Sequence, residues 1–322
     1  MTYAACLRVI NPGLWTTIQD LGRAGLRQFG VPCAGAFDRG AHMLANALVG
    51  NDAAAATLEI TQNGGVFECL HPVHVALAGA PLVPVIEPPS ASSSSPRVPS
   101  AFTLQPGDRL FLRPPRSGFR TYLALRGGAQ GPVVLGSRSQ ETPLRAGDLI
   151  TAQASKGRGQ HPHDELVKPF DSTSSGRASL RILQGPDAPL WPELYDATVS
   201  VRPDSNRVGI RLARSAPYET PPPTPDSSRL SAPIAPGAIQ ATASGLVIIG
   251  VAGGTMGGYP HVAHVVSADL DRVAQLRPGD EVAFLPVSLE EARELDIAQR
   301  LTRQSAALRI RAAVEVVDLA SR

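Results

Sequence analysis

Short apolar runs broken by glycine and proline dominate the pattern of this sequence. The runs VHVALAG at 73–79, TYLALRG at 121–127 and LVIIGVAG at 246–253 are rich in β-branched or aromatic residues, and turn-forming residues bound them. Runs of this length between turn signals are typical of β-strands. Many short strands of this kind predict a mainly β protein built from closed barrels, rather than alternating strands and helices.

Three Gly-Asp pairs stand directly before apolar runs, at 107–108, 147–148 and 279–280. Glycine adopts backbone angles that other residues avoid, and an aspartate side chain can accept hydrogen bonds from nearby backbone amides. We therefore expect three turns of the same kind, each leading into a strand.

Two segments have helical periodicity instead. The segment 38–51 places apolar side chains on one face, and Asp38 stands before it as a possible helix cap. The segment 288–308 begins with Ser288, which is followed three residues later by Glu291, the spacing of a capping box. We expect helices at both places, the second long enough to lie across a barrel or against a partner.

Short segments recur in the same order at an offset of 172 to 174 residues. A constant offset indicates a duplication, so the two halves are expected to superpose as barrels. The matching pairs are LRVI at 7–10 with LRIL at 180–183, ALAG at 76–79 with GVAG at 250–253, and LQPGDRLFL at 104–112 with LRPGDEVAF at 276–284.

This repeat predicts the domain organisation. We expect a first barrel at 1–152 and a second barrel at 179–290. The stretch 153–178 between them is rich in polar and turn-forming residues, as linkers are. A C-terminal helix and tail should occupy 291–322.

Composition narrows the possible functions. Hydrophobic residues make up 43% and charged residues 18%, which is typical of a globular protein, and a net charge of +2 offers no basic surface for nucleic acid. No apolar run could span a bilayer and no signal peptide is visible, so we expect a cytoplasmic protein without a membrane partner. Cys6, Cys33 and Cys69 lack the spacing of a disulfide framework or a zinc site.

Standard catalytic motifs are missing. The sequence has no GxxxxGK[ST] phosphate loop, no GxSxG elbow, no HExxH pair and no biotin-acceptor lysine context, so we expect no ATPase site within this chain. His261 and His264 are three residues apart, as are His71 and His74. In a regular strand such positions face opposite sides, so neither pair is expected to share a metal. The cluster at 161–165 lies in the linker, and we expect it to be solvated.

Nine motifs occur in order along the chain and resemble one known family. The first four are GLWTTIQDLGR at 13–23, GVPCAGAFD at 30–38, LANALVGN at 44–51 and LEIT at 58–61. The others are PRSGFRTYLALRGG at 115–128, LGSRS at 135–139, PGAIQ at 236–240, GGYP at 257–260 and SADLDRVAQLRPGD at 267–280. Together they resemble the biotin-dependent carboxyltransferase family of the subdomain A/B type, which includes allophanate hydrolase subunit 2 and the C component of 5-oxoprolinase.

The resemblance implies two tandem cyclophilin-like β-barrel domains with a few helices. It also implies the C component of an ATP-dependent 5-oxoprolinase, a hydrolase in which this component acts with subunits A and B and opens the lactam 5-oxoproline to glutamate, with ATP used by the complex. One alternative is a carboxyltransferase component of a urea carboxylase-like enzyme, which would depend on biotin. Another is a non-catalytic regulatory protein that antagonises a kinase inhibitor. The enzymatic alternatives share a cleft for a small amide or lactam.

Two arginine-serine pairs are the best candidates for binding an anionic substrate. Arg116 precedes Ser117, and Arg138 precedes Ser139. A guanidinium group can hold a carboxylate or phosphate with two parallel hydrogen bonds, and an adjacent hydroxyl can add a third. Surface ion pairing would explain these arginines equally well.

The remaining candidates have equally plausible structural roles. Asp20 and Arg23 flank a turn, where they could form a site or a buried ion pair. Asp38 fits a helix cap better than a catalytic base. Adjacent glycines let backbone amides approach an anion closely, or simply make a tight turn with a tyrosine packed over it. This applies to Gly257, Gly258 and Tyr259.

The chain departs from its apparent relatives in two loops. Relatives carry Asp, Arg and Gln where this chain has Ala252, Gly253 and Gly254, and they have a glycine-rich extension after LGSRS where QETPLRAGD follows here. If those polar groups bind substrate, the substrate differs or the activity is weak. The altered loop at 251–256 keeps the regulatory alternative open.

Overall fold

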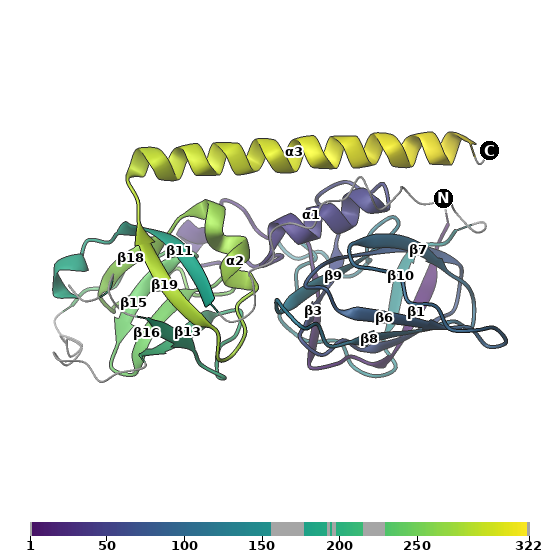
Figure 1. The fold of residues 1–322 in the computed structure, drawn as a ribbon, viewed down its shortest axis with the longest axis horizontal. Coiled ribbons are helices and arrows are strands. Elements are labelled where there is room, and N and C mark those ends of the chain that lie inside the picture. The colour runs from purple at the N-terminus through teal and green to yellow at the C-terminus, as the bar shows by residue number, and fades with distance from the viewer. Residues whose placement is uncertain (1, 156–176, 192–193, 195–197, 215–228, 321–322) are drawn as a thin grey trace. The chain divides into compact units, whose positions relative to one another are not determined.

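The chain forms two compact units, which a computed structural model describes at residues 2–155, 177–191, 194, 198–214 and 229–320 (Figure 1). The first unit contains residues 1–22, 38–172 and 302–322, and the second contains 23–37 and 173–301. The second unit therefore takes one short segment from within the N-terminal motif region. Strands dominate both units, which confirms the predicted mainly β class.

Two five-stranded antiparallel sheets build the first unit. They enclose one core, to which Leu7 and Phe67 contribute from one sheet and Leu58 and Leu123 from the other. In spatial order, one sheet is β10 (Leu149–Gln153), β1 (Tyr3–Asn11), β4 (Val66–Cys69), β8 (Arg109–Arg113) and β6 (Val83–Glu87). The other is β2 (Trp15–Gln19), β3 (Thr57–Thr61), β9 (Arg120–Leu125), β5 (Val73–Gly79) and β7 (Ser100–Leu104).

A closed barrel of seven strands forms the second unit, around a core that includes Leu180, Ile239 and Phe284. Its only parallel pairing among the described strands joins the first and last of them, β11 and β19. The order is β11 (Arg177–Gln184), β18 (His261–Val265), β15 (Ala238–Thr242), β16 (Gly245–Ile249), β13 (Gly209–Arg214), β12 (Val199–Val201) and β19 (Glu281–Pro286). A separate short pair consists of β14 (Ala232–Pro233) and β17 (Met256–Gly257).

The first pair of repeated segments, LRVI and LRIL, lies in strands that pair with different kinds of neighbouring strand in the two units. LRVI lies in β1, between the antiparallel strands β10 and β4. LRIL lies in β11, between antiparallel β18 and parallel β19. ALAG is part of β5, whereas GVAG begins in the turn after β16. Superposition of the halves therefore stays a prediction, as do the domain bounds drawn from the repeat.

The three Gly-Asp turns are alike, as predicted. The carboxylate of each aspartate accepts a 2.8 Å hydrogen bond from the backbone N–H three residues earlier. Each glycine has a positive φ, between 89° and 93°. The aspartates are Asp108, Asp148 and Asp280.

Both predicted helices are present. Helix α1 (Arg39–Leu48) is capped by Asp38, whose carboxylate accepts a 2.8 Å hydrogen bond from Ala41 N–H. Helix α3 (Leu289–Ala320) is preceded by Ser288, whose hydroxyl accepts a 3.1 Å bond from Glu291 N–H. It runs beyond residue 308 because the residues that follow contain neither glycine nor proline. A short α2 (Leu270–Ala274) follows β18. None of the described helices is long and apolar enough to cross a membrane.

Candidate functional site

The motifs in the first unit converge on a buried polar layer between helix α1 and the sheet that contains β2, β3 and β9. Alternation along these strands puts apolar side chains such as Ile18 and Leu58 in the core and polar ones on the opposite face. That face packs on α1, because the helix contacts β3, β5, β7 and β9. The buried polar residues are Thr17, Gln19, Thr57, Glu59, Arg120 and Tyr122 from the strands and His42 and Asn46 from the helix.

A buried ion pair lies at the centre of this layer. The side chains of Arg120 and Glu59 are 2% and 1% exposed, and Arg120 Nε lies 3.5 Å from Glu59 Oε1. The Tyr122 hydroxyl donates a 2.7 Å bond to Glu59 Oε2 and accepts a 2.7 Å bond from Asp38 N–H. Burial, together with the Glu59 charge, raises the pKa of Tyr122 well above its ordinary value, so the hydroxyl remains a donor. This chain of bonds fixes the start of α1.

His42 is held in one tautomer inside the same layer. Its Nε2 lies 3.0 Å from the Ala53 carbonyl oxygen, which can only accept, so Nε2 carries the proton. Its Nδ1 then accepts from the Thr57 hydroxyl at 2.9 Å. Complete burial lowers the pKa of His42 to about 4. A neutral imidazole with both nitrogens bonded is a structural element and leaves no nitrogen for catalysis.

The low pKa of His42 predicts acid sensitivity. Because the pKa is about 4 in the folded chain against an ordinary 6.5, the unfolded chain takes up the proton first as the pH falls. The free energy of unfolding should therefore decrease from pH 6.5 down to about pH 4. A His42→Gln variant should show a flatter dependence in urea titrations across this range. Part of the slope should remain, since burial also lowers the pKa of His264 to about 4. An unchanged slope in His42→Gln would contradict the assignment.

Asp20 fastens the loop that carries Arg138. Its Oδ1 accepts 2.6 Å bonds from the hydroxyls of Ser137 and Ser139 and a 2.8 Å bond from Gly22 N–H, while Oδ2 accepts a 2.6 Å bond from Arg138 N–H. Burial by itself would raise the pKa of Asp20, but these four bonds outweigh it and the pKa is lowered. The carboxylate is thus charged, only 8% exposed and fully engaged, which favours a positioning role over that of a base.

The Arg138 guanidinium is half-buried and only partly used. One Nη donates a 3.1 Å bond to Gln130 Oε1. Its Nε is buried and has no hydrogen-bond partner among the described residues. The loop turns sharply just before it, because Leu135 and Gly136 have φ values of 51° and 78°. A half-buried guanidinium that is held in place and has N–H donors beyond the one bonded to Gln130 is what a carboxylate, phosphate or polarised carbonyl would need.

The other predicted arginine, Arg116, lies elsewhere in the first unit. Its loop is anchored where Phe119 O accepts a 2.7 Å bond from Gln62 N–H, beside the Trp15–Thr61 end of the β2–β3 pair. Asp20 follows the Gln19–Thr57 end of that pair, four residue pairs away and so roughly 13 Å along the strands. Asp20, Arg138 and Ser139 therefore form one cluster. The exposed Arg116 and the half-buried Ser117 lie near the other end of the β2–β3 pair and are not part of it.

The second unit holds the rest of the N-terminal motif region. Arg23 N–H donates a 2.7 Å bond to Cys33 O, and Ala34 N–H donates a 2.9 Å bond to Val251 O. Arg207, which is 5% exposed, donates a 2.7 Å bond from Nη2 to Gly35 O. The first bond lies within 23–37, the second fastens this segment to the loop after β16, and the third fastens it to the turn before β13. Sequence reasoning missed Arg207, as it missed Ser137 and Gln130; for Arg207 the only signal was a lone arginine directly before an apolar strand.

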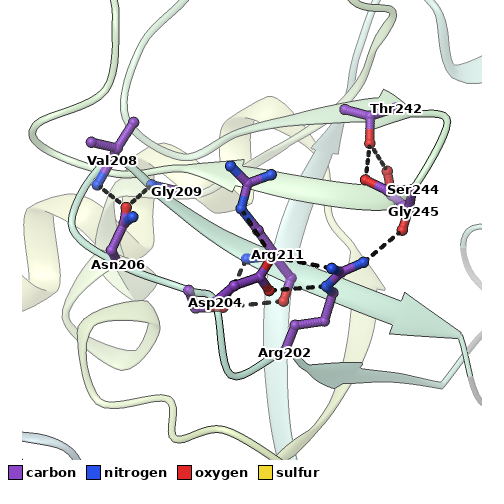
Figure 2. Close-up of polar contacts among 10 residues, drawn as sticks. Arg202, Asp204, Asn206, Val208, Gly209, Arg211, Thr242, Ser244 and Gly245 are labelled. Atoms are coloured by element: carbon purple, nitrogen blue, oxygen red, sulfur yellow. Dashed lines mark hydrogen bonds and ion pairs between the residues drawn. The ribbon is translucent and has the colours of Figure 1, made fainter.

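The turn that presents Arg207 is held by its own polar contacts (Figure 2). Asp204 pairs with Arg202 at 3.0 Å and with Arg211 at 3.6 Å, and Asn206 Oδ1 accepts a 2.8 Å bond from Val208 N–H. The three charged side chains are between 36% and 51% exposed, so each pair contributes little to stability. Their effect is to shape the turn.

The glycine candidates in the second unit are constrained by packing. A Cβ at Gly257 in β17 would lie 2.4 Å from Gln240 Nε2, so a larger residue there would have to displace the end of the Gln240 side chain. Gly258 has more room, since the nearest atom to a Cβ there would be Ser231 Oγ at 3.6 Å. Tyr259 is 44% exposed, and its carbonyl accepts a 3.4 Å bond from Gln240.

The altered loop cannot simply regain the side chains of the relatives. A Cβ at Gly253 would lie 2.6 Å from Ile249 Cγ2 and 2.8 Å from Val208 O, whereas Gly254 has space for one. The backbone of this loop has therefore adapted to glycine at position 253. An arginine there would require the backbone to move.

The expectation that His261 and His264 face opposite sides was wrong. Their ring centroids are 5.5 Å apart. The pairing of β18 with β15 skips Val262, and this bulge turns both rings to the same side. No group of three metal ligands occurs among the described residues, and the cluster at 161–165 lies outside them.

A surface cleft of about 540 Å³ opens at one end of the first unit. It is separate from the Asp20 cluster, and no predicted site residue lines it. Glycine backbones and two asparagines form much of its wall, and its charged member is Arg113. Its lining is Asn11, Gly13, Leu14, Asn63, Gly64, Gly65, Val66, Phe111, Leu112, Arg113 and Pro114.

Comparisons with known proteins identify the same family that the motifs resemble. The carboxyltransferase domain family, subdomain A and B, matches residues 29–286. The chain is 33% identical to the C component of 5-oxoprolinase from Escherichia coli, over 89% of this chain and 93% of that protein. It is 30% identical to urea amidolyase of Saccharomyces cerevisiae, over 93% of this chain but only 18% of that protein.

Solved structures give the same result. The urea amidolyase of K. lactis superposes with a TM-score of 0.80 at 26% identity, covering 95% of this chain and 20% of that one. The chain thus corresponds to about a fifth of that much longer enzyme. Since the family match spans most of the chain and includes both units, the chain belongs to the carboxyltransferase domain family, subdomain A and B.

Proposed function

We propose that this chain is the C component of an ATP-dependent 5-oxoprolinase, and that it acts on 5-oxoproline together with subunits A and B. The observation that carries the proposal is 33% identity across 93% of the length of the E. coli C component. A match over nearly the whole relative covers almost all of the region that the C component contributes to its complex. ATP would be used by the assembled complex, because the sequence contains no phosphate loop.

Within this proposal Arg138 binds the substrate. The 5-oxoproline molecule carries a carboxylate and a lactam carbonyl, and hydrolysis gives a second carboxylate. The half-buried Arg138 guanidinium carries N–H donors beyond the one that Gln130 accepts, and these could bind one of these oxygens, while Asp20 holds the loop that presents the guanidinium. Gln130 orients its other end. Arg138 therefore supports binding and charge stabilisation rather than proton transfer.

The test is glutamate release from 5-oxoproline by the chain reconstituted with its companion subunits and ATP. Arg138→Ala should lower kcat/KM by roughly 10- to 100-fold, since a charge-assisted hydrogen bond contributes about 1.5–3 kcal/mol. Arg138→Lys should recover only part of this, because lysine lacks the planar fork. Arg145→Ala is the matched control, as this arginine is exposed on a turn of the same unit. Equal activity of the Arg138 and Arg145 variants would contradict the proposed role.

A carboxyltransferase component dependent on biotin is the second candidate. It is favoured by the similarity to urea amidolyase, whose chain includes a region with the same fold over 95% of this chain. The two candidates separate in one assay. An oxoprolinase component releases glutamate from 5-oxoproline without biotin, whereas a carboxyltransferase component consumes carboxybiotin in the presence of an amide acceptor.

A further inference from the structure

Helix α3 carries an exposed apolar stripe that takes no part in the proposed site. Ile297, Leu301 and Leu308 are 51%, 61% and 68% exposed. At 3.6 residues per turn their side chains fall within about 40° of one another around the helix. The buried side chains of α3 lie on the opposite face; they are Ala292, Ile310 and Val314.

This helix lies beyond the domain that defines the family. The family match ends at residue 286, and α3 begins at Leu289 and continues unbroken to Ala320 (Figure 1). Its inner face has partners in the chain: Ala292 packs with Val266 and Ala268, and Gln299 donates a 2.7 Å bond to Ala268 O. Its outer face is therefore available for a partner outside the chain.

The outer face has the spacing of a helix-pairing seam. Its members alternate by three and four residues, as the two seam positions of a heptad do. Four of the six are apolar or amide side chains, and a charge of opposite sign stands at each end. In order they are Glu294, Ile297, Leu301, Gln304, Leu308 and Arg311.

This seam is complementary to itself when two copies run antiparallel. A single register places Glu294 opposite Arg311, Ile297 opposite Leu308 and Leu301 opposite Gln304, and the same three layers repeat by symmetry. A parallel pair would instead set Glu294 against Glu294 and Arg311 against Arg311. Small residues beside the seam, Ser305 and Ala312, let the helices approach closely.

From this complementarity we infer that two copies of this chain associate through antiparallel α3 helices. The contact is isologous, since each copy presents the same surface to the other. The seam from Glu294 to Arg311 is about 27 Å long at 1.5 Å per residue, so the interface is small. We expect a reversible dimer with a dissociation constant on the order of micromolar. The inference does not rest on the proposed function, and its tests involve no turnover.

The first test is sedimentation of the full chain across a concentration series. The unmodified chain should move from monomer to dimer. Leu301→Glu combined with Leu308→Glu should leave it monomeric, because four carboxylates would meet in an apolar seam. Leu289→Glu is the matched control: this leucine is also exposed, at 47%, but stands about 80° or more away from the stripe. It should dimerise as the unmodified chain does, and circular dichroism should show that every variant stays folded.

A charge exchange tests the register. Glu294→Arg alone and Arg311→Glu alone each create two like-charge layers, and each should weaken the dimer roughly 10-fold at low salt. The double variant restores opposite charges and should recover the dissociation constant of the unmodified chain. Failure of the double variant to recover it would overturn the antiparallel register.

Cysteine cross-linking tests the orientation, in a Cys33→Ser background because Cys33 is the one cysteine not buried. The Ile297→Cys and Leu308→Cys single variants should form an intermolecular disulfide on mild oxidation when the two are mixed, because these positions face each other in the antiparallel pair. Each of these variants alone, and Leu301→Cys alone, should form little. A parallel pair would cross-link each single variant by itself, which would contradict the inference.

Three further results would overturn the dimer itself. The chain could remain monomeric at every concentration, or form a dimer that the Leu301 and Leu308 substitutions leave intact. In the third, a monomeric chain would bind a companion subunit and lose that binding in the same variant, which would make the companion, not a second copy, the occupant of the stripe.

Discussion

Arg120→Met should lower the free energy of unfolding of the first unit by about 3–5 kcal/mol. Methionine nearly matches the length of the arginine stem, so the main loss is the charge. Glu59 would then remain 1% exposed without its countercharge. A buried ion whose partner is removed destabilises a protein far more than the intact pair stabilises it, because the desolvation of the remaining charge is no longer offset.

The effect should reach helix α1 because the bonds are continuous. Glu59 accepts from Tyr122, which in turn accepts from Asp38 N–H at the start of the helix. Hydrogen exchange is the suitable measurement, since peptides from α1 and β3 report on the first unit and peptides from β15 and β16 provide an internal reference. Protection of the backbone amides against exchange should fall in the α1 and β3 peptides and stay unchanged in the β15 and β16 peptides.

The double variant Arg120→Met with Glu59→Leu is the control. It replaces both charges by apolar side chains, so no charge is left buried without its partner, and a large part of the lost stability should return. Tyr122 would lose its acceptor, so recovery should be incomplete. If the single and double variants were equally destabilised, the ion pair would not be the cause of the loss.

Asp20→Ala is expected to have the second large effect. The substitution removes the acceptor of four hydrogen bonds and leaves two serine hydroxyls and two backbone N–H groups in a nearly dry environment. Hydrogen bonds to a charged group contribute about 1.5–3 kcal/mol each and are not additive, so we expect a loss of roughly 3 kcal/mol. Glutamate release by the reconstituted complex should fall at least as far as in Arg138→Ala, because the loop that holds Arg138 loses its anchor.

The pH dependence separates Asp20 from the other carboxylates. Because the folded pKa of Asp20 is below its ordinary 3.8, its contribution to stability is present above that value and is lost as the pH falls through the lower, folded pKa. Asp20→Asn should therefore be less stable than the unmodified chain at neutral pH, and the difference should narrow in strong acid. Ser137→Ala with Ser139→Ala should reproduce part of the effect with the carboxylate present. A variant with unchanged stability would show that the loop does not depend on Asp20.

Local sequence signals determined a large part of this protein. Helix α1 begins where Asp38 can cap it, and α3 begins where Ser288 can, because a cap needs only residues within one turn. The three Gly-Asp turns are equally local, since each aspartate bonds an amide three residues away. The ordered motifs were sufficient to identify the family, which the match over residues 29–286 confirms.

Contacts between distant segments were decided only by the tertiary structure. Asp20 and Ser137 are 117 residues apart, and no periodicity shows that one accepts a bond from the other. The same holds for Arg207 and Gly35, 172 residues apart. The separation of Arg116 from Arg138 likewise depends on which end of the β2–β3 pair each loop meets.

The histidine pair shows the limit of pattern reasoning most directly. Strict alternation sends His261 and His264 to opposite faces, yet one extra residue at Val262 brings the rings within 5.5 Å. A bulge depends on how the neighbouring strand β15 pairs, which is a property of the closed barrel and not of the strand itself. Sequence thus determined the elements and their caps, because those depend on neighbours along the chain. The strand register and the contacts between distant side chains were decided by the tertiary structure, because the fold brings remote strands together.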